Sequence, residues 1–155
     1  MNQERAGLKP LRAAWVFLLA YVTITVVATA FSLAIESRMH VPEDTPPLSN
    51  PAYLLAEKFF PLLNLLVWVG FAGLYFRKRI VGTFSTREAW VLGAVWLGLA
   101  VVVDYVGFVL IKNPISLSPH DFYIGQAPWI YLIYAVVLVS PWVYCKLAAR
   151  SSQSA

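Results

Sequence analysis

The sequence has few of the residues from which most redox and metal sites are built. Among its 155 residues there is one cysteine, Cys145, and there are two histidines. A single cysteine excludes an internal disulfide and any cysteine-rich metal or redox site. Charged residues make up only 13% of the chain, whereas soluble domains average about a quarter. This shortage of charge, with a mean hydropathy of +0.66, predicts a membrane protein.

Motifs that carry common enzyme chemistry are also missing. There is no serine nucleophile motif, no glycine-rich phosphate loop and no dinucleotide fingerprint. His40 and His120 lie in separate predicted loops, and their spacing to nearby acids does not match a zinc site. We therefore expect no metal and no cofactor, and we identify no catalytic residue. The net charge of +4 sits in short segments beside apolar runs, which indicates membrane topology and not nucleic-acid binding.

Four apolar stretches are long enough to cross a bilayer, which requires about 20 helical residues. We predict spans at about 13–35, 53–76, 88–111 and 128–147. The first run also resembles a cleavable signal peptide, with basic residues before it and Ala28-Thr29-Ala30 within it. It stays mostly apolar through Ile35, however, which is longer than a typical signal core. The sequence therefore predicts one integral membrane domain, 1–155, that forms an all-α, four-transmembrane-helix bundle with up-down topology.

Local signals predict where some of these helices begin or bend. Asn50 followed by Pro51 is typical of a capped helix start. Pro61 should kink the second helix, because proline removes a backbone donor. Ser85 and Glu88 have the spacing of a capping box, which predicts that the third helix opens there.

Basic residues alternate along the chain in a way that predicts orientation. Nine of them flank the N-terminal side of the first span, the middle loop and the C-terminal tail: Arg5, Lys9, Arg12, Arg77, Lys78, Arg79, Arg87, Lys146 and Arg150. The other two loops and their flanks carry only Arg38, Lys58 and Lys112. The positive-inside rule then places both termini in the cytoplasm of a multi-pass protein of the cell (plasma) membrane.

Asp104 is the most informative residue, because it is the only charged residue between Glu88, at the start of the third span, and Lys112. An acid at membrane depth is costly and is by default a functional-site hypothesis. Gly93 and Ala100 are seven residues apart, and Asp104 follows four later. Small residues at this spacing let helices approach closely, so we expect Asp104 to face the bundle interior. The alternative is a structural acid, hydrogen-bonded to Asn64 or to a tyrosine, that fixes helix register.

The other three spans supply polar side chains at a similar depth, counted by helical rise. We therefore predict a polar crevice that opens toward the outer side of the membrane. Asp104 would be its central group, with Asn64 and Tyr134 beside it and three residues nearer the rim. The ligand-binding candidates are Asp104, Asn64, Tyr134, Tyr131, Thr29 and Glu57.

The leading functional hypothesis is a non-enzymatic membrane protein that binds or transports a small molecule, an ion or a lipid headgroup. Four spans enclose little volume, so transport would require a homodimer or a larger membrane complex within the lipid bilayer. Two alternatives stay open. One is a membrane-embedded hydrolase or lipid-modifying enzyme that uses Asp104 with a second acid, either Asp121 or Glu57. The other is a regulatory or assembly subunit of a membrane complex.

The size, the four spans and the pair Asp104 and Asp121 are similar to the lipoprotein signal peptidases, which are aspartyl enzymes. The flanking residues differ: Asp104 lies in Val-Val-Val-Asp-Tyr-Val-Gly-Phe, and Asp121 lies in Pro-His-Asp-Phe-Tyr. Neither stretch carries that family's motif, so we assign the chain to no family.

Overall fold

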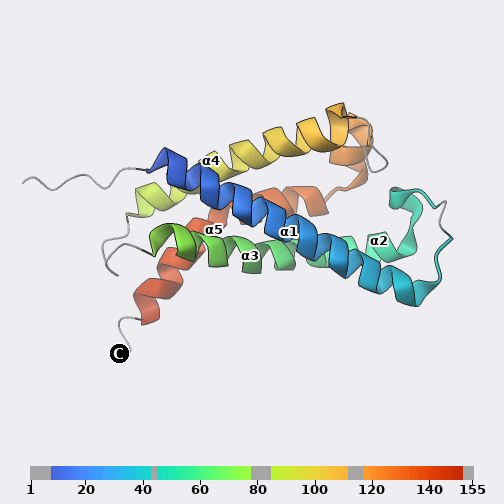
Figure 1. Cartoon of the computed structure of the whole chain (residues 1–155), viewed down its shortest axis with the longest axis horizontal. Coiled ribbons are helices and arrows are strands. Elements are labelled where there is room, and N and C mark those ends of the chain that lie inside the picture. Colours follow the sequence, from blue (N-terminus) through green and yellow to red (C-terminus); the bar gives the residue numbers. More distant parts are fainter. Residues whose placement is uncertain (1–7, 43–44, 78–84, 112–116, 152–155) are drawn as a thin grey trace, which may run out of the picture.

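The computed structural model describes residues 8–42, 45–77, 85–111 and 117–151, and the regular structure in these ranges is entirely helical. The helices form four long rods, which can be followed in Figure 1. The first is α1 (Pro10–Met39), which ends at His40 in a left-handed conformation. The second is built of α2 (Pro51–Ala56), η2 (Glu57–Phe59) and α3 (Phe60–Phe76). The third is α4 (Thr86–Asp104) with η3 (Tyr105–Leu110), and the fourth is α5 (Trp129–Ser151). Short η1 (Pro47–Ser49) and η4 (Asp121–Gly125) lie between rods.

Rods that follow one another in sequence run in opposite directions (Figure 1). We call the end where α1 begins and α5 ends the terminal end, and the opposite end, which carries α2 and η4, the loop end. Each rod is long and apolar enough to cross a membrane, so the prediction of four candidate spans is confirmed. Which end faces the cytoplasm stays a prediction. Four of its markers, Arg5, Lys78, Arg79 and Lys112, lie outside the described residues.

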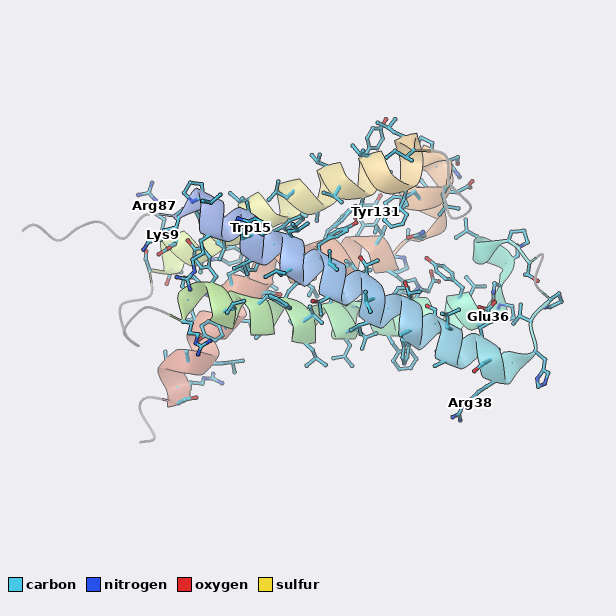
Figure 2. All side chains as sticks on the ribbon, in the orientation of Figure 1. Lys9, Trp15, Glu36, Arg38, Arg87 and Tyr131 are labelled. Carbon is cyan, nitrogen blue, oxygen red and sulfur yellow. The ribbon has the colours of Figure 1, made fainter. Side chains whose placement is uncertain are left out.

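The surface of the rods is apolar in the middle and charged at the ends. Large exposed side chains include Leu18, Val26, Leu62, Leu66 and Val102. Figure 2 shows Lys9 and Arg87 at the terminal end, and Glu36 and Arg38 at the loop end. This distribution fits a bundle surrounded by hydrocarbon, since charged side chains are costly at membrane depth.

The second rod begins and breaks where the sequence predicts. The Asn50 side-chain oxygen accepts hydrogen bonds from the backbone N–H groups of Ala52, at 2.8 Å, and Tyr53, at 3.2 Å. Near Pro61 the α-helix is interrupted by η2, and the Phe60 N–H donates to the Glu57 carbonyl. Pro61 has no N–H to offer that carbonyl, so the tighter turn satisfies it instead.

The predicted capping box at the start of α4 is wrong. The Ser85 side chain makes no capping hydrogen bond. Glu88 is buried, and its Oε1 accepts a hydrogen bond from the Tyr75 hydroxyl of α3 at 3.2 Å. The same hydroxyl accepts from the Lys9 backbone N–H at 3.0 Å. Glu88 therefore ties three rods together at the terminal end, and a tertiary contact has replaced the local one.

An aromatic stack fills the middle of the bundle. Ring centroids of Phe17 (α1) and Trp68 (α3) lie 5.6 Å apart, and those of Trp68 and Trp96 (α4) lie 5.3 Å apart. The Trp96 indole N–H donates to the Ala13 carbonyl at 3.1 Å. A buried indole needs such a partner, so this contact fixes the third rod against the first.

The small-residue face of α4 packs inward, as predicted. Gly93, Ala100 and Asp104 are all buried. A Cβ on Gly93 would lie 2.0 Å from the backbone oxygen of Leu138 in α5, so the two helices touch backbone to backbone. Ile111, seven residues after Asp104, is exposed. The reason is the π-helix from Tyr105 to Leu110, whose wider turn moves later residues off the face.

Candidate functional site

Asp104 joins three rods through two tyrosines. Its side chain lies at the end of α4 and is only 9% exposed. The Tyr21 hydroxyl, from α1, donates a hydrogen bond to Oδ1. The Tyr134 hydroxyl, from α5, donates to Oδ2 at 2.8 Å. Each carboxylate oxygen therefore has one tyrosine donor, which leaves further lone pairs on both oxygens.

More tyrosines gather around this carboxylate. The ring hydroxyl of Tyr123, in η4, interacts electrostatically with Asp104 and with the tyrosines of α5 and η3. Burial raises the pKa of Tyr123, and the negative charge of Asp104 raises it further. Five of the eight tyrosines of the chain belong to this group, which we call the tyrosine cluster: Tyr21, Tyr105, Tyr123, Tyr131 and Tyr134.

The backbone changes its helical form directly after Asp104. α4 ends at Asp104, and the π-helix η3 begins at Tyr105. The Tyr105 N–H donates to both the Val101 and Val102 carbonyls, which marks the change in pitch. Single π-turns inside α-helices are found often at functional sites. Tyr105 and the start of η3 directly follow the acid in sequence.

Asp104 makes no ion pair within the described part of the chain. A carboxylate removed from water without a positive partner is strongly disfavoured. Two tyrosine hydroxyls reduce this cost, because each gives a charge-assisted hydrogen bond, but they supply no net positive charge. Within the described structure, the hydrogen-bond partners of Asp104 are therefore hydroxyl groups and not cations.

The structure brings some predicted residues to Asp104 and gives others different partners. Tyr134 contacts the acid directly, as predicted. Asn64 does not: its amide donates to the Phe60 carbonyl at 2.9 Å and accepts from the Trp68 indole at 3.0 Å. Asn64 thus orients the aromatic stack from within its own helix.

The three predicted rim residues have separate environments. Tyr131 is half-exposed on the first turn of α5 and interacts with Tyr123. Thr29 is exposed on α1, so it faces away from the bundle interior. Glu57 is 7% exposed, and its Oε2 has no hydrogen-bond partner in the described structure.

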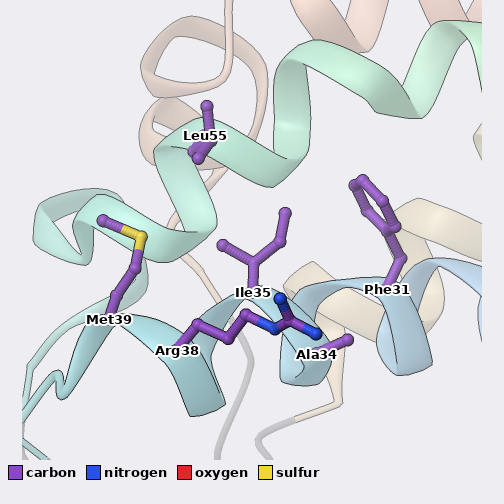
Figure 3. A pocket seen from close by; sticks show the side chains of 6 residues that line it. All are labelled: Phe31, Ala34, Ile35, Arg38, Met39 and Leu55. Atoms are coloured by element: carbon purple, nitrogen blue, oxygen red, sulfur yellow. The ribbon is translucent and has the colours of Figure 1, made fainter.

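A groove is present at the loop end, but it is not the predicted crevice. It lies between the last turns of α1 and α2, with a volume of about 420 Å³. Figure 3 shows apolar side chains around it, with the Arg38 guanidinium folded back along α1. None of the six predicted site residues lines it.

Sequence reasoning missed Tyr21, Tyr123 and Tyr105, which directly follows Asp104. Tyr21 carried a usable signal, because it is a polar side chain one helical turn before Thr25 within the first span. In the structure the Thr25 hydroxyl donates to the Tyr21 carbonyl at 2.8 Å. Tyr123 carried no such signal, because the segment around it was predicted as a loop and forms the short π-helix η4.

A second acid does not meet Asp104 in the described contacts. The Asp121 carboxylate accepts from the Ser118 hydroxyl at 2.8 Å, and its other oxygen lies 3.6 Å from His120 Nδ1. The Asp121 N–H donates to the same Ser118 oxygen at 3.0 Å. Asp121 therefore organises the start of η4. The hydrolase alternative gains no support from this pair, because acid–base work needs both groups within reach of one substrate.

No protein-family model, curated protein or solved structure matches this chain. The tyrosine cluster and Asp104 are therefore the features that bear on function.

Proposed function

We propose that this small membrane protein binds an organic ammonium cation at Asp104, within its membrane-crossing bundle. The observation that carries the proposal is a buried carboxylate that has tyrosine donors on both oxygens and no ion pair within the described part of the chain. Buried charges are normally paired. The missing partner would be supplied by the ligand.

The chemistry of the cluster favours an organic cation over a metal ion. Metal ions of the hard type take six or more oxygen ligands. Among the described residues, no three His, Cys, Asp or Glu side chains converge as metal ligands would. Aromatic faces attract ammonium groups, and quaternary ammonium ligands are recognised in this way. Tyr123 interacts electrostatically with Asp104 and also with Tyr105 and Tyr131, so aromatic residues are available around the acid, and the carboxylate supplies the opposite charge.

A thermal-stability titration tests the proposal. Purified protein in one detergent is melted with increasing tetramethylammonium chloride, while sodium chloride keeps the ionic strength constant. We expect a saturable rise in the melting temperature, because a ligand at 100 times its dissociation constant stabilises the folded state by about 2.7 kcal/mol. The Asp104→Asn variant should lose the rise. A wild type whose melting temperature does not respond to any ammonium probe would contradict the proposal.

A second candidate is favoured by the same hydrogen bonds. Because both oxygens of Asp104 are occupied by the chain's own hydroxyls, the acid also fits a clamp between α1, α4 and α5 in an assembly or regulatory subunit. The triple variant Asp104→Leu, Tyr21→Phe, Tyr134→Phe separates the two. Replacing a whole buried polar set by apolar groups is often neutral or stabilising. A triple variant as stable as the wild type favours the binding site, whereas one destabilised by several kcal/mol favours the clamp.

A further inference from the structure

Glu57 is a buried acid with one unused oxygen. Its side chain is 7% exposed, and its Oε2 makes no hydrogen bond in the described structure. A buried carboxylate oxygen that accepts no hydrogen bond destabilises the folded state more than one that does, because no hydrogen bond offsets its loss of water. Such a group is best explained by a partner that is present only part of the time.

Glu57 and Asp104 belong to the same interior. Along the second rod the buried residues include Glu57, Asn64 and Trp68, which are spaced by seven and four residues and so share one helical face. Trp68 packs on Phe17 and through it on the first rod. The face that carries Glu57 is therefore turned to the inside of the bundle, where Asp104 also points.

The two acids lie at different levels. Phe17 contacts both Trp68 and Tyr21, and one turn toward the loop end from Trp68 lies Asn64. Tyr21, the partner of Asp104, is therefore at the level of Asn64. Glu57 is seven residues closer to the loop end, which corresponds to about 10 Å of helix. A cation that moves from the loop end toward Asp104 passes the level of Glu57 first.

One cation and one tyrosine lie near Glu57 along its own rod. Lys58, the adjacent residue, is exposed, and its positive charge acts on Glu57 electrostatically. Tyr53 lies one turn closer to the loop end and interacts electrostatically with Glu57. No cationic side chain hydrogen-bonds Oε2 within the described ranges.

We propose that Glu57 is an intermediate station for the cation on its way between the loop end and Asp104. This inference rests on the proposed function and adds the direction of entry. The unused oxygen pairs transiently with the ammonium group, which lowers the barrier for passage in both directions. Glu57 is thus a positioning residue for access, while Asp104 holds the bound cation.

Rates of binding separate this role from that of Asp104. Radiolabelled tetramethylammonium is added to detergent-solubilised protein, and bound label is followed by rapid filtration during association and after dilution. We expect Glu57→Gln to slow association and dissociation together by about tenfold, the lower range for electrostatic effects on rates, and to leave the dissociation constant unchanged. Glu36→Gln is the matched control, because Glu36 also lies near the loop end but its Oε1 is already bonded to Asn50 at 2.9 Å.

Each outcome has a distinct meaning. Glu57→Gln rates within twofold of the wild type overturn the station and leave Asp104 as the binding site. Loss of equilibrium binding in Glu57→Gln also overturns it, because Glu57 would then be part of the bound-state site. Equal slowing in Glu36→Gln would show a general surface-charge effect and would overturn it as well. A melting curve for each variant establishes that it is folded. Absence of binding by the wild type contradicts the proposed function itself.

Discussion

Substitution of Gly93 by alanine is expected to force α4 and α5 apart. The added Cβ would lie 2.0 Å from the Leu138 backbone oxygen and 2.9 Å from its carbonyl carbon. Real Cβ atoms essentially never come closer than 3.0 Å to such atoms, so the helices must separate by about 1 Å. The obstacle is backbone and cannot rotate away, so the cost belongs at the upper part of the range of about 1–3 kcal/mol for overpacking.

Gly98 offers a matched control in the same helix. A Cβ at Gly98 meets nothing within 4 Å, and alanine is favoured over glycine in a helix by about 0.5–1 kcal/mol. Reversible unfolding in mixed micelles, titrated with sodium dodecyl sulfate, compares the free energies of both variants with the wild type. Gly93→Ala should be destabilised and Gly98→Ala should be neutral or slightly stabilised. Equal stability of the two variants would refute backbone contact between α4 and α5.

Two further predictions concern the helix start and the loop end. Asn50→Ala should destabilise the protein by about 1 kcal/mol, since it removes two capping bonds and the bond to Glu36, whereas Ser85→Ala should be neutral in the same unfolding titration. Because the folded pKa of Tyr123 is raised, the stability that its hydroxyl contributes is present below its unfolded value of about 10 and is lost as the pH rises through the folded value. The ionisation of Tyr123 can be followed by ultraviolet absorbance, as the difference between the titrations of the wild type and of Tyr123→Phe. We expect Tyr123 to ionise at high pH in the wild type and at a lower pH in Asp104→Asn. An unchanged titration in Asp104→Asn would contradict the influence of Asp104.

The helical architecture could be predicted from the sequence because membrane spans follow simple physical rules. Length and apolarity set the rods, and the capping side chain of Asn50 acts within one turn. The inward orientation of Asp104 follows from the cost of placing a charge toward lipid. These properties depend on single residues or on short segments, so they can be predicted without knowing which residues come into contact.

The partners of Asp104 could be predicted only in part, because they depend on how the helices pack. Depth counting placed Asn64 and Tyr134 at similar levels, but depth does not determine rotation about the helix axis. Tyr134 turns toward the acid, whereas Asn64 turns to Trp68 in its own helix. Tyr21 completes the site from 83 residues away in sequence, and the π-turn after Asp104 has no clear signature in residue type.

Whether Asp104 holds the cation can be measured by equilibrium binding of radiolabelled tetramethylammonium to the wild type and to Asp104→Asn, both reconstituted in phosphatidylcholine bilayers. We expect saturable binding to the wild type that sodium does not displace at equal ionic strength, and loss of that binding in the variant. Equal binding by the two proteins, or none by the folded wild type, would contradict the assignment of Asp104 as the cation site.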